Sequence, residues 1–330
     1  MIKQCLRITL ILHIPEWELS KILVTGGAGF IGSNLVMELL NQGNEIVVFD
    51  NEFRGSFNNL QDKKIHKVSG DITKINDWKN LPKDISSIYH LGAINGTKFF
   101  YEIPEKVMEV NTKGIMNCLE FTRERDIEKI LFTSSSEIYG FPKIFPTPET
   151  EEMVIPDPYN PRFSYSSSKI LGELLCINYA KKYGFKHTIV RYHNIYGPNM
   201  GHEHVIPEFV RKLVNKEEFN VEGDGTESRS FCYIDDAVKG TILVNNEEKA
   251  ENRIYNIGNP EETTINELIL LLSTISGIEI KPNYKLKNQA GTKRRQPDIK
   301  KAMLIGYEPK IPLTEGLAKT YEWYKNYFLK

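Results

Sequence analysis

The sequence predicts an α/β protein built on a doubly wound parallel sheet, with a smaller C-terminal α/β lobe. From Lys21 onward, short runs of β-branched and apolar residues alternate with helical patterns. Parallel strands are covered by helices on both faces, so nearly continuous apolar strands separated by helices are typical of this class. After about Tyr196 the alternation loosens into loops with Pro and Gly, which indicates the second lobe.

The predicted elements follow one another in order. A strand over 21–26 leads into a helix over 30–43 that ends at Gly43, a residue type that commonly closes helices. Five further strands are predicted in the first 200 residues, at 45–50, 67–72, 86–93, 129–136 and 186–197. In the second lobe, the clearest helices are predicted at 206–216 and 265–277.

The chain therefore divides into three parts. Residues 1–20 are an N-terminal extension of unknown role, 21–195 the sheet domain, and 196–330 mainly the second lobe, from which the chain crosses back once to the first. The apolar run at 6–14 is about half the length needed to cross a bilayer. No membrane segment or signal peptide is expected.

Composition excludes several classes of function. Lys and Arg number 42 and Asp and Glu 43, so no overall charge attracts nucleic acid or an anionic membrane. The four cysteines are far apart and form no C-x-x-C pair. They are interpreted as reduced packing residues of a cytoplasmic protein, rather than as a disulfide framework or a zinc site.

A glycine-rich loop joins the first predicted strand to the first helix. Gly26, Gly29 and Gly32 form G-x-x-G-x-x-G within "VTGGAGFIGSNL", with Phe30 and Ile31 before the last glycine. Glycines let the backbone approach a ligand closely, and a helix N-terminus offers unpaired N–H groups to a pyrophosphate. With a strand before it and a helix after it, this loop predicts dinucleotide binding.

The ends of the next strands supply further candidate cofactor contacts. Asp50 ends the second strand 18 residues after Gly32 and is followed by Asn51. A carboxylate there binds the adenosine ribose hydroxyls and repels a 2′-phosphate, which favours NAD over NADP. After the third and fourth strands, the residues expected to line the same crevice are Asp71, Ile72, Leu91, Gly92 and Ala93.

A catalytic group is predicted from "SSSEIYG" and "YSSSK". Ser135 ends a strand, and Tyr165 and Lys169 share one helix face because they are four residues apart. The Lys169 ammonium and the positive nicotinamide are expected to lower the phenol pKa from about 10. Tyr165 then takes a proton from a substrate hydroxyl while a hydride passes to NAD, Ser135 bonds the reacting oxygen, and Lys169 also holds the nicotinamide ribose.

Seven motifs together give the chain from Lys21 onward a specific resemblance: "TGGAGFIGSN", "HLGA", "SSSEIYG", "YSSSK", "RYHNIYGP", "DGTESRSFCYIDD" and "RRQPD". The chain resembles the extended short-chain dehydrogenase/reductase family, and within it the NAD-dependent nucleotide-sugar epimerases and dehydratases. This resemblance implies a Rossmann-type NAD-binding domain at 21–195 and a lobe at 196–330 that holds a nucleotide diphosphate sugar. It also implies tightly held NAD and a transient 4-keto sugar.

The resemblance assigns further residues. Asn194, Arg229 and Arg295 match positions that contact the substrate diphosphate, with Arg294 as an alternative to Arg295, and Ser136 is a further substrate contact. Guanidinium groups suit this task because they stay charged and bond oxygens in pairs. The family uses no metal, and its members pair as homodimers through two helices, here near 110–124 and 165–182.

Glu137 bears on which reaction is catalysed. In this family, 4,6-dehydratases and UDP-glucuronate decarboxylases carry a glutamate at this place, where it performs acid–base chemistry beside the ketone; it also occurs in some epimerases and could simply cap a turn. The leading interpretation is an epimerase/dehydratase for a surface sugar. The alternatives are a nucleotide-sugar decarboxylase, a 4-dehydrogenase, and an NAD(H)-binding regulatory protein without catalysis. The nucleotide base and the sugar are not readable from the sequence.

Overall fold

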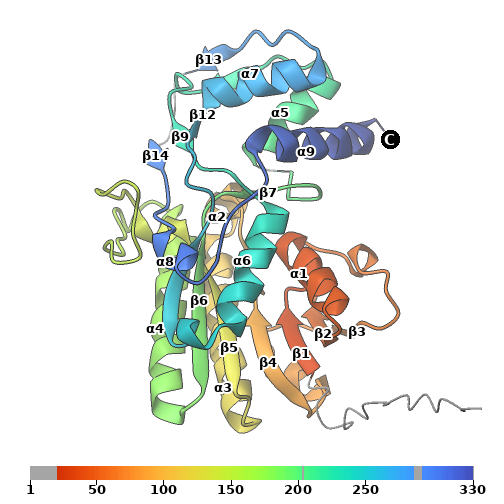
Figure 1. Ribbon diagram of the computed structural model, residues 1–330, viewed down its shortest axis with the longest axis vertical. Coiled ribbons are helices and arrows are strands. Elements are labelled where there is room, and N and C mark those ends of the chain that lie inside the picture. Colours follow the sequence, from red (N-terminus) through yellow and green to blue (C-terminus); the bar gives the residue numbers. More distant parts are fainter. Residues whose placement is uncertain (1–20, 203, 286–291, 330) are drawn as a thin grey trace, which may run out of the picture.

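A seven-stranded parallel sheet forms the centre of the computed structural model, which describes residues 21–202, 204–285 and 292–329 (Figure 1). Its strand order is β11-β6-β5-β4-β1-β2-β3, so the order reverses between β1 and β4. The predicted doubly wound sheet is confirmed. Its strands are β1 (Lys21–Thr25), β2 (Glu45–Asp50), β3 (His66–Ser69), β4 (Ile85–His90), β5 (Lys129–Ser135), β6 (Lys186–Tyr192) and β11 (Arg253–Ile257).

Helices cover both faces of this sheet because its strands are apolar on both sides. In β1, Val24 lies opposite Val48 of β2 and packs into the core on one face, whereas its neighbour Leu23 packs into the core on the other. The first face is covered by α1 (Phe30–Asn41) and α6 (Ile234–Asn246). The second is covered by α3 (Pro104–Glu124) and α4 (Phe163–Tyr183).

The second lobe lies beyond the carboxyl ends of the strands (Figure 1). Its helices are α5 (Val205–Val214), α7 (Ile265–Ser276) and α9 (Leu313–Phe328), close to the predicted helices at 206–216 and 265–277. Short strands complete the lobe, namely β8 (Asn220–Glu222) paired with β13 (Asn283–Lys285), and β9 (Ser228–Arg229) between β12 (Thr263–Thr264) and β14 (Arg294–Arg295).

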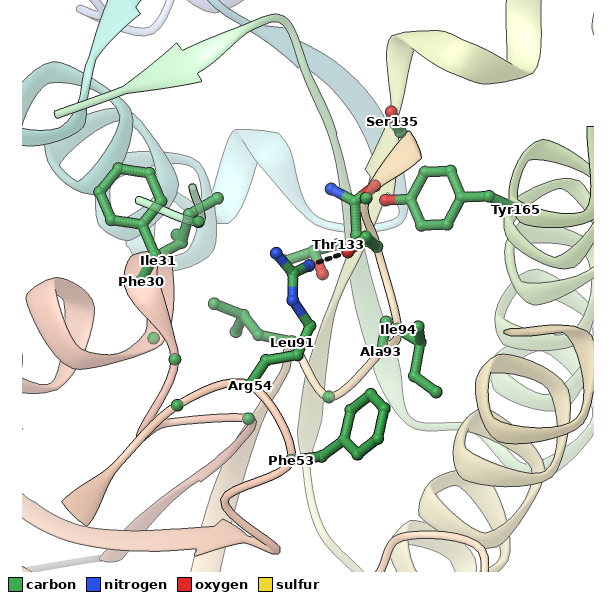
Figure 2. A pocket seen from close by; sticks show the side chains of 18 of the residues that line it. Phe30, Ile31, Phe53, Arg54, Leu91, Ala93, Ile94, Thr133, Ser135 and Tyr165 are labelled. Atoms are coloured by element: carbon green, nitrogen blue, oxygen red, sulfur yellow. Dashed lines mark hydrogen bonds between the residues drawn. The ribbon is translucent and has the colours of Figure 1, made fainter. Parts of the chain in front are cut away.

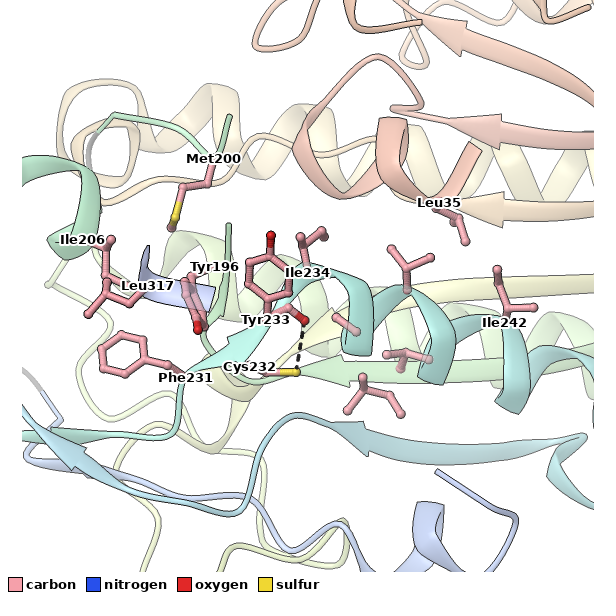
Figure 3. Packing of buried hydrophobic residues seen from close by; sticks show 14 of the residues in the cluster. Leu35, Tyr196, Met200, Ile206, Phe231, Cys232, Tyr233, Ile234, Ile242 and Leu317 are labelled. Carbon is pink, nitrogen blue, oxygen red and sulfur yellow. Dashed lines mark hydrogen bonds between the residues drawn. The ribbon is translucent and has the colours of Figure 1, made fainter. Parts of the chain in front are cut away.

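One hydrophobic core joins the two parts of the molecule. It runs from Leu35 of α1 through Ile234 of α6 to Leu317 of α9 (Figure 3). The chain returns from the second lobe to the sheet through α6 and β11, which supplies the strand beside β6. The second lobe therefore shares buried surface with the face of the sheet that α1 covers.

Three predicted strands end at least three residues earlier than expected. The strand predicted over 86–93 stops at His90, so Leu91, Gly92 and Ala93 lie in the loop beyond it. The strand predicted over 67–72 stops at Ser69, which leaves Asp71 and Ile72 in the loop beyond it. The strand predicted over 186–197 stops at Tyr192, because Asn194 takes a left-handed backbone conformation with φ 42° that no strand can contain. The remainder forms β7 (Ile195–Tyr196), which pairs with β10 (Cys232–Tyr233).

Cys118, Cys176 and Cys232 are buried free thiols. Cys5 and the whole predicted extension at 1–20 lie outside the described residues. Within the described ranges, no helix combines the length and the apolar character that a membrane crossing requires.

Candidate active site

The glycine loop is packed so closely that side chains would not fit. Gly26 has φ 71°, and a Cβ there would lie 2.7 Å from the backbone nitrogen of Gly92, while a Cβ at Gly32 would lie 2.1 Å from the Gly26 carbonyl oxygen. Helix α1 starts at Phe30, and its cap residue Gly29 supplies no side-chain hydrogen bond. The first N–H groups of α1 are therefore available to an anion, as a pyrophosphate requires.

The Asp50 carboxyl is fixed against the same loop. One oxygen accepts a hydrogen bond from the backbone N–H of Ala28 at 3.0 Å, and the other accepts one from Glu52 at 2.7 Å. Burial raises the pKa of Asp50, and these two N–H donors oppose that rise. The loop and the acid thus form one rigid unit, with the carboxyl at the end of β2 where a ribose would lie.

A cavity of about 480 Å³ opens at this edge of the sheet (Figure 2). Among the residues that line it are all those predicted to bind NAD, namely Gly26, Gly29, Phe30, Ile31, Gly32, Asp50, Asn51, Asp71, Ile72, Leu91, Gly92, Ala93, Tyr165 and Lys169. Ser135, Ser136, Glu137 and Asn194 also line it. A single cleft therefore holds both the predicted cofactor contacts and the predicted reactive groups.

Helix α4 brings Tyr165 and Lys169 to the carboxyl end of β5. Both side chains are buried, and the Lys169 ammonium donates a hydrogen bond to the carbonyl oxygen of Thr133 at 2.7 Å. Burial lowers the pKa of Lys169 to about 7, although the charge of Glu173 opposes this. Ser135 ends β5, and its hydroxyl, which accepts a hydrogen bond from the Glu137 backbone N–H at 3.2 Å, lies near Tyr165. Serine, tyrosine and lysine thus converge as predicted.

The predicted lowering of the tyrosine pKa is not found in the protein alone. Burial raises the pKa of Tyr165, and the nearby Ser135 hydroxyl only partly opposes that rise. The ring stacks on Phe100 at 5.1 Å, while the Lys169 nitrogen lies 5.7 Å from the ring centroid and bonds elsewhere. Bound NAD would supply the hydride acceptor and a positive charge that favours the phenolate.

Glu137 lies among arginines. Its carboxylate is 3.0 Å from Arg295 and 3.5 Å from Arg162, and Arg295 also donates to the Ser136 hydroxyl at 3.2 Å. Burial alone would raise the pKa of Glu137, but the charges of Arg295, Arg162 and Arg229 together outweigh burial and lower it. Glu137 is therefore a carboxylate at neutral pH, and the wall around it is positively charged.

The three residues predicted to contact the substrate diphosphate differ in how they lie relative to the cavity. Asn194 lines the cavity, and its side-chain amide donates to the Ser230 carbonyl oxygen at 3.4 Å. Arg229 and Arg295 are not among the lining residues described, although Arg295 reaches the wall through Glu137. Arg229 donates to the Ser228 carbonyl oxygen at 2.7 Å, and burial lowers its pKa to about 10.

The choice between two neighbouring arginines is resolved by their directions. Arg294 is exposed and pairs with Glu262, its Nε lying 2.8 Å from the carboxylate. Arg295 is buried beside Glu137. Arg295, rather than the alternative Arg294, therefore lies directly behind a residue that lines the cleft.

Comparison with known proteins decides the family. Residues 22–258 match the model of the NAD-dependent epimerase/dehydratase family. The chain belongs to this family. Its predicted family, fold class, enzyme class and cofactor are thereby confirmed.

Three proteins illustrate the similarity to this epimerase/dehydratase family. UDP-glucuronic acid decarboxylase 6 of Arabidopsis thaliana is 36% identical over 305 residues, which cover 90% of this chain and 86% of the relative. The UDP-glucose 4-epimerase of Thermotoga maritima, solved with UDP-glucose, has a TM-score of 0.86 and 33% identity over 94% of this chain and 100% of that chain. The UDP-glucuronic acid 4-epimerase of Bacillus cereus, solved with UDP-glucuronic acid and NAD, has a TM-score of 0.83 and 30% identity, over 93% of this chain and 99% of that chain.

Sequence reasoning missed several residues of this epimerase/dehydratase site. Arg162 pairs with Glu137, Phe100 supports the Tyr165 ring, and Arg54 lines the cleft. Arg162 could have been found, because it lies in "PRFSYSSSK" just before the catalytic tyrosine. Nothing in the local sequence shows that Phe100 packs against Tyr165.

No metal was predicted for this family member. Within the described part of the chain, no group of three or more His, Cys, Asp or Glu side chains could hold a metal ion. The rings of His202 and Tyr327 stack with their centroids 4.8 Å apart. Burial lowers the pKa of His204 to about 4, and the charge of Arg54 adds to that lowering. Glu203, between these histidines, lies outside the described residues.

Proposed function

We propose that the protein is a nucleotide-sugar 4-epimerase, which oxidises the C4 alcohol of a UDP-sugar to a ketone and reduces it to the opposite alcohol. The observation that carries this proposal is the convergence of Ser135, Tyr165 and Lys169 beside the glycine loop in one cleft. Residues 21–195 would hold NAD, and 196–330 mainly the nucleotide sugar. Relatives named for UDP-sugar 4-epimerisation support this substrate class.

Each catalytic side chain has a task set by its position. The Tyr165 phenolate takes the proton of the C4 hydroxyl as the hydride leaves C4, and returns a proton to the ketone oxygen when the hydride comes back. Ser135, which lines the cleft beside Tyr165, would bond the same oxygen. Lys169, held by the Thr133 carbonyl, stabilises the phenolate through its positive charge.

Glu137 is compatible with dehydration as well as with epimerisation. Loss of a C6 hydroxyl as water requires a base that removes the C5 proton and an acid that protonates the departing hydroxyl. Glu137 lines the cleft, and the charges of Arg295 and Arg162 hold it in the ionised form, which can accept the C5 proton and then pass it to the C6 oxygen. The mass of the product, rather than the charge of Glu137, therefore separates epimerisation from loss of water.

The same cluster favours decarboxylation as a second candidate function. Arg162 and Arg295 give the wall beside Glu137 a net positive charge, which suits the C6 carboxylate of a uronic acid. Oxidation at C4 would place a ketone next to C5, and that ketone would accept the electron pair left when carbon dioxide departs. The similarity to UDP-glucuronic acid decarboxylase 6 supports this candidate.

One experiment separates these reactions. The protein is incubated with UDP-, GDP-, dTDP- and CDP-sugars, including UDP-glucose and UDP-glucuronate, and products are followed by chromatography and mass spectrometry. Epimerisation gives a new isomer of unchanged mass, whereas decarboxylation, dehydration and simple oxidation remove carbon dioxide, water and two hydrogens respectively. Absence of any new product from the whole panel would contradict the proposed enzyme.

We also infer that the protein is a cytoplasmic homodimer formed through α3 and α4. Met108 and Met116 on α3 are 46% and 42% exposed, and Leu171 and Leu174 on α4 are 41% and 46% exposed. Helical spacing gathers these apolar side chains on the outer faces of two adjacent helices. Such a patch is typical of a self-association surface, and buried free thiols suit a reducing compartment.

A further inference from the structure

Arg54 is a cation inside the cofactor cleft to which no function has been assigned. It lies in the loop after β2, and its side chain points into the pocket between Ile31 of α1 and Tyr165 of α4 (Figure 2). The guanidinium donates a hydrogen bond to the carbonyl oxygen of Asn95, in the loop after β4. It also lies over the ring of Phe99, 5.4 Å from the centroid. These contacts fix its direction across the cleft.

Gly201 and His204 of the second lobe also lie close to the Arg54 guanidinium. A Cβ added at Gly201 would lie 2.6 Å from an Arg54 nitrogen. Burial lowers the pKa of His204 to about 4, and the charge of Arg54 adds to that lowering. Three segments, following β2, β4 and β7, therefore surround Arg54 and hold its charge over the middle of the cleft.

No side chain of the glycine loop balances the negative charge of a diphosphate. The loop offers backbone N–H groups but contains no Lys or Arg, while Asp50 adds a carboxyl at the adenosine end. A dinucleotide brings a diphosphate with two negative charges. Other cations of the cleft have partners placed elsewhere, since Lys106 pairs with Glu109 at 3.1 Å and Lys169 bonds a carbonyl.

We propose that Arg54 binds the diphosphate of the cofactor from the side of the cleft opposite the glycine loop. A guanidinium presents five N–H donors in a planar fork, so it can bond two phosphate oxygens and keep its bond to Asn95. The glycine loop and the α1 N-terminus would hold the diphosphate from one side, and Arg54 from the other. This inference rests on membership of the NAD-dependent family and not on which sugar reaction follows.

A nucleotide sugar also carries a diphosphate. The position of Arg54 distinguishes the diphosphate of the cofactor from that of the substrate. Arg54 lies four residues after Asp50, in the loop that continues from the strand end expected to contact the adenosine ribose. The arginines of the substrate side, Arg162 and Arg295, lie together at Glu137 after β5. Arg54 therefore belongs to the cofactor diphosphate.

The test is ligand binding to Arg54→Ala protein cleared of bound nucleotide, measured by isothermal titration calorimetry. NAD and ADP-ribose should bind about 10- to 100-fold more weakly than to the wild type, because a charge-assisted pair of hydrogen bonds is lost. Adenosine, which lacks the diphosphate, and UDP should bind as to the wild type. Arg54→Lys should be intermediate, and Arg253→Ala, at the opposite edge of the sheet, should change nothing.

Each other result would overturn the proposal. Unchanged affinity for NAD and ADP-ribose would show that Arg54 does not bind the diphosphate. An equal loss for UDP would assign Arg54 to the substrate instead, and an equal loss for adenosine would show a collapsed loop rather than a lost phosphate contact. An unchanged melting temperature of the nucleotide-free variant confirms that it folds.

Discussion

His90, at the carboxyl end of β4, couples stability to pH. It is buried, and its Nδ1 shares a hydrogen bond with the Thr25 hydroxyl at 2.8 Å. Burial lowers its pKa to about 3 from the ordinary value of 6.5, and the charge of Lys169 adds to the effect. Because the unfolded chain takes up this proton first, the contribution of neutral His90 is complete above pH 6.5 and is lost as the pH falls toward 3.

The variant His90→Gln should therefore be less sensitive to acid. Between pH 6.5 and about pH 5, its free energy of unfolding should fall by about 2 kcal/mol less than that of the wild type, because one protonation is removed from the unfolded state. Urea unfolding at the two pH values measures this difference. His66→Gln, at an exposed position on β3, is the control. Equal falls in wild type and His90→Gln would contradict the burial argument.

At the scale of residues, the sequence identified those site candidates whose position is determined by their own strand or turn. Gly26 and Asp50 were found because a strand-to-helix turn and a strand end place them without help from distant residues. Arg162 and Arg54 were missed, because their places depend on contacts with Glu137 and Asn95, far away in the sequence. The lowering of the Tyr165 pKa was predicted for the protein with bound NAD; in the protein alone, burial, which is not visible in sequence spacing, raises that pKa.

At the scale of elements, α4 presents a buried polar face and an exposed apolar one. Tyr165 and Lys169 lie buried on the face toward β5, whereas Leu171 and Leu174 lie exposed on the outside. The helix and its catalytic spacing were predictable from the sequence. The early end of β6 was not, because it depends on the left-handed backbone of Asn194, whose side chain lines the cleft.

The outer face of α4 gives a prediction about assembly. Leu174→Glu should convert the proposed homodimer into monomers, because a charge would be buried against the apolar surface of the second copy. Size-exclusion chromatography with light scattering measures the mass. Leu304→Glu, at a site 87% exposed after α8 (Lys300–Met303), is the matched control and should stay dimeric. A Leu174→Glu protein that remains dimeric would exclude this surface.

At the scale of the whole molecule, one buried polar network ties distant segments together behind the site. Arg191 of β6 donates to both carboxylate oxygens of Glu173 on α4, at 2.9 and 2.7 Å, and to the Tyr139 hydroxyl at 3.0 Å. Tyr139 in turn donates to the side-chain oxygen of Asn256 on β11 at 2.9 Å. The network joins the helix that carries Tyr165 to the strand that returns from the second lobe.

Breaking this network should cost far more than breaking a surface pair. Glu173→Gln should lower the free energy of unfolding by about 3–5 kcal/mol, because it leaves the Arg191 charge buried without its partner. Urea unfolding measures the change. Glu109→Gln, which removes exposed pairs with Lys106 and Lys113, should change the free energy of unfolding far less. Similar losses in both variants would show that burial of the pair does not matter.

The account depends most on Tyr165 as the group that moves the proton at C4. The most direct measurement compares wild type and Tyr165→Phe on the sugar nucleotide that the wild type converts, with bound NAD quantified in each. We predict that turnover falls by about 10²- to 10⁴-fold while NAD content is unchanged, since only the hydroxyl is removed. Full turnover by Tyr165→Phe would contradict the account.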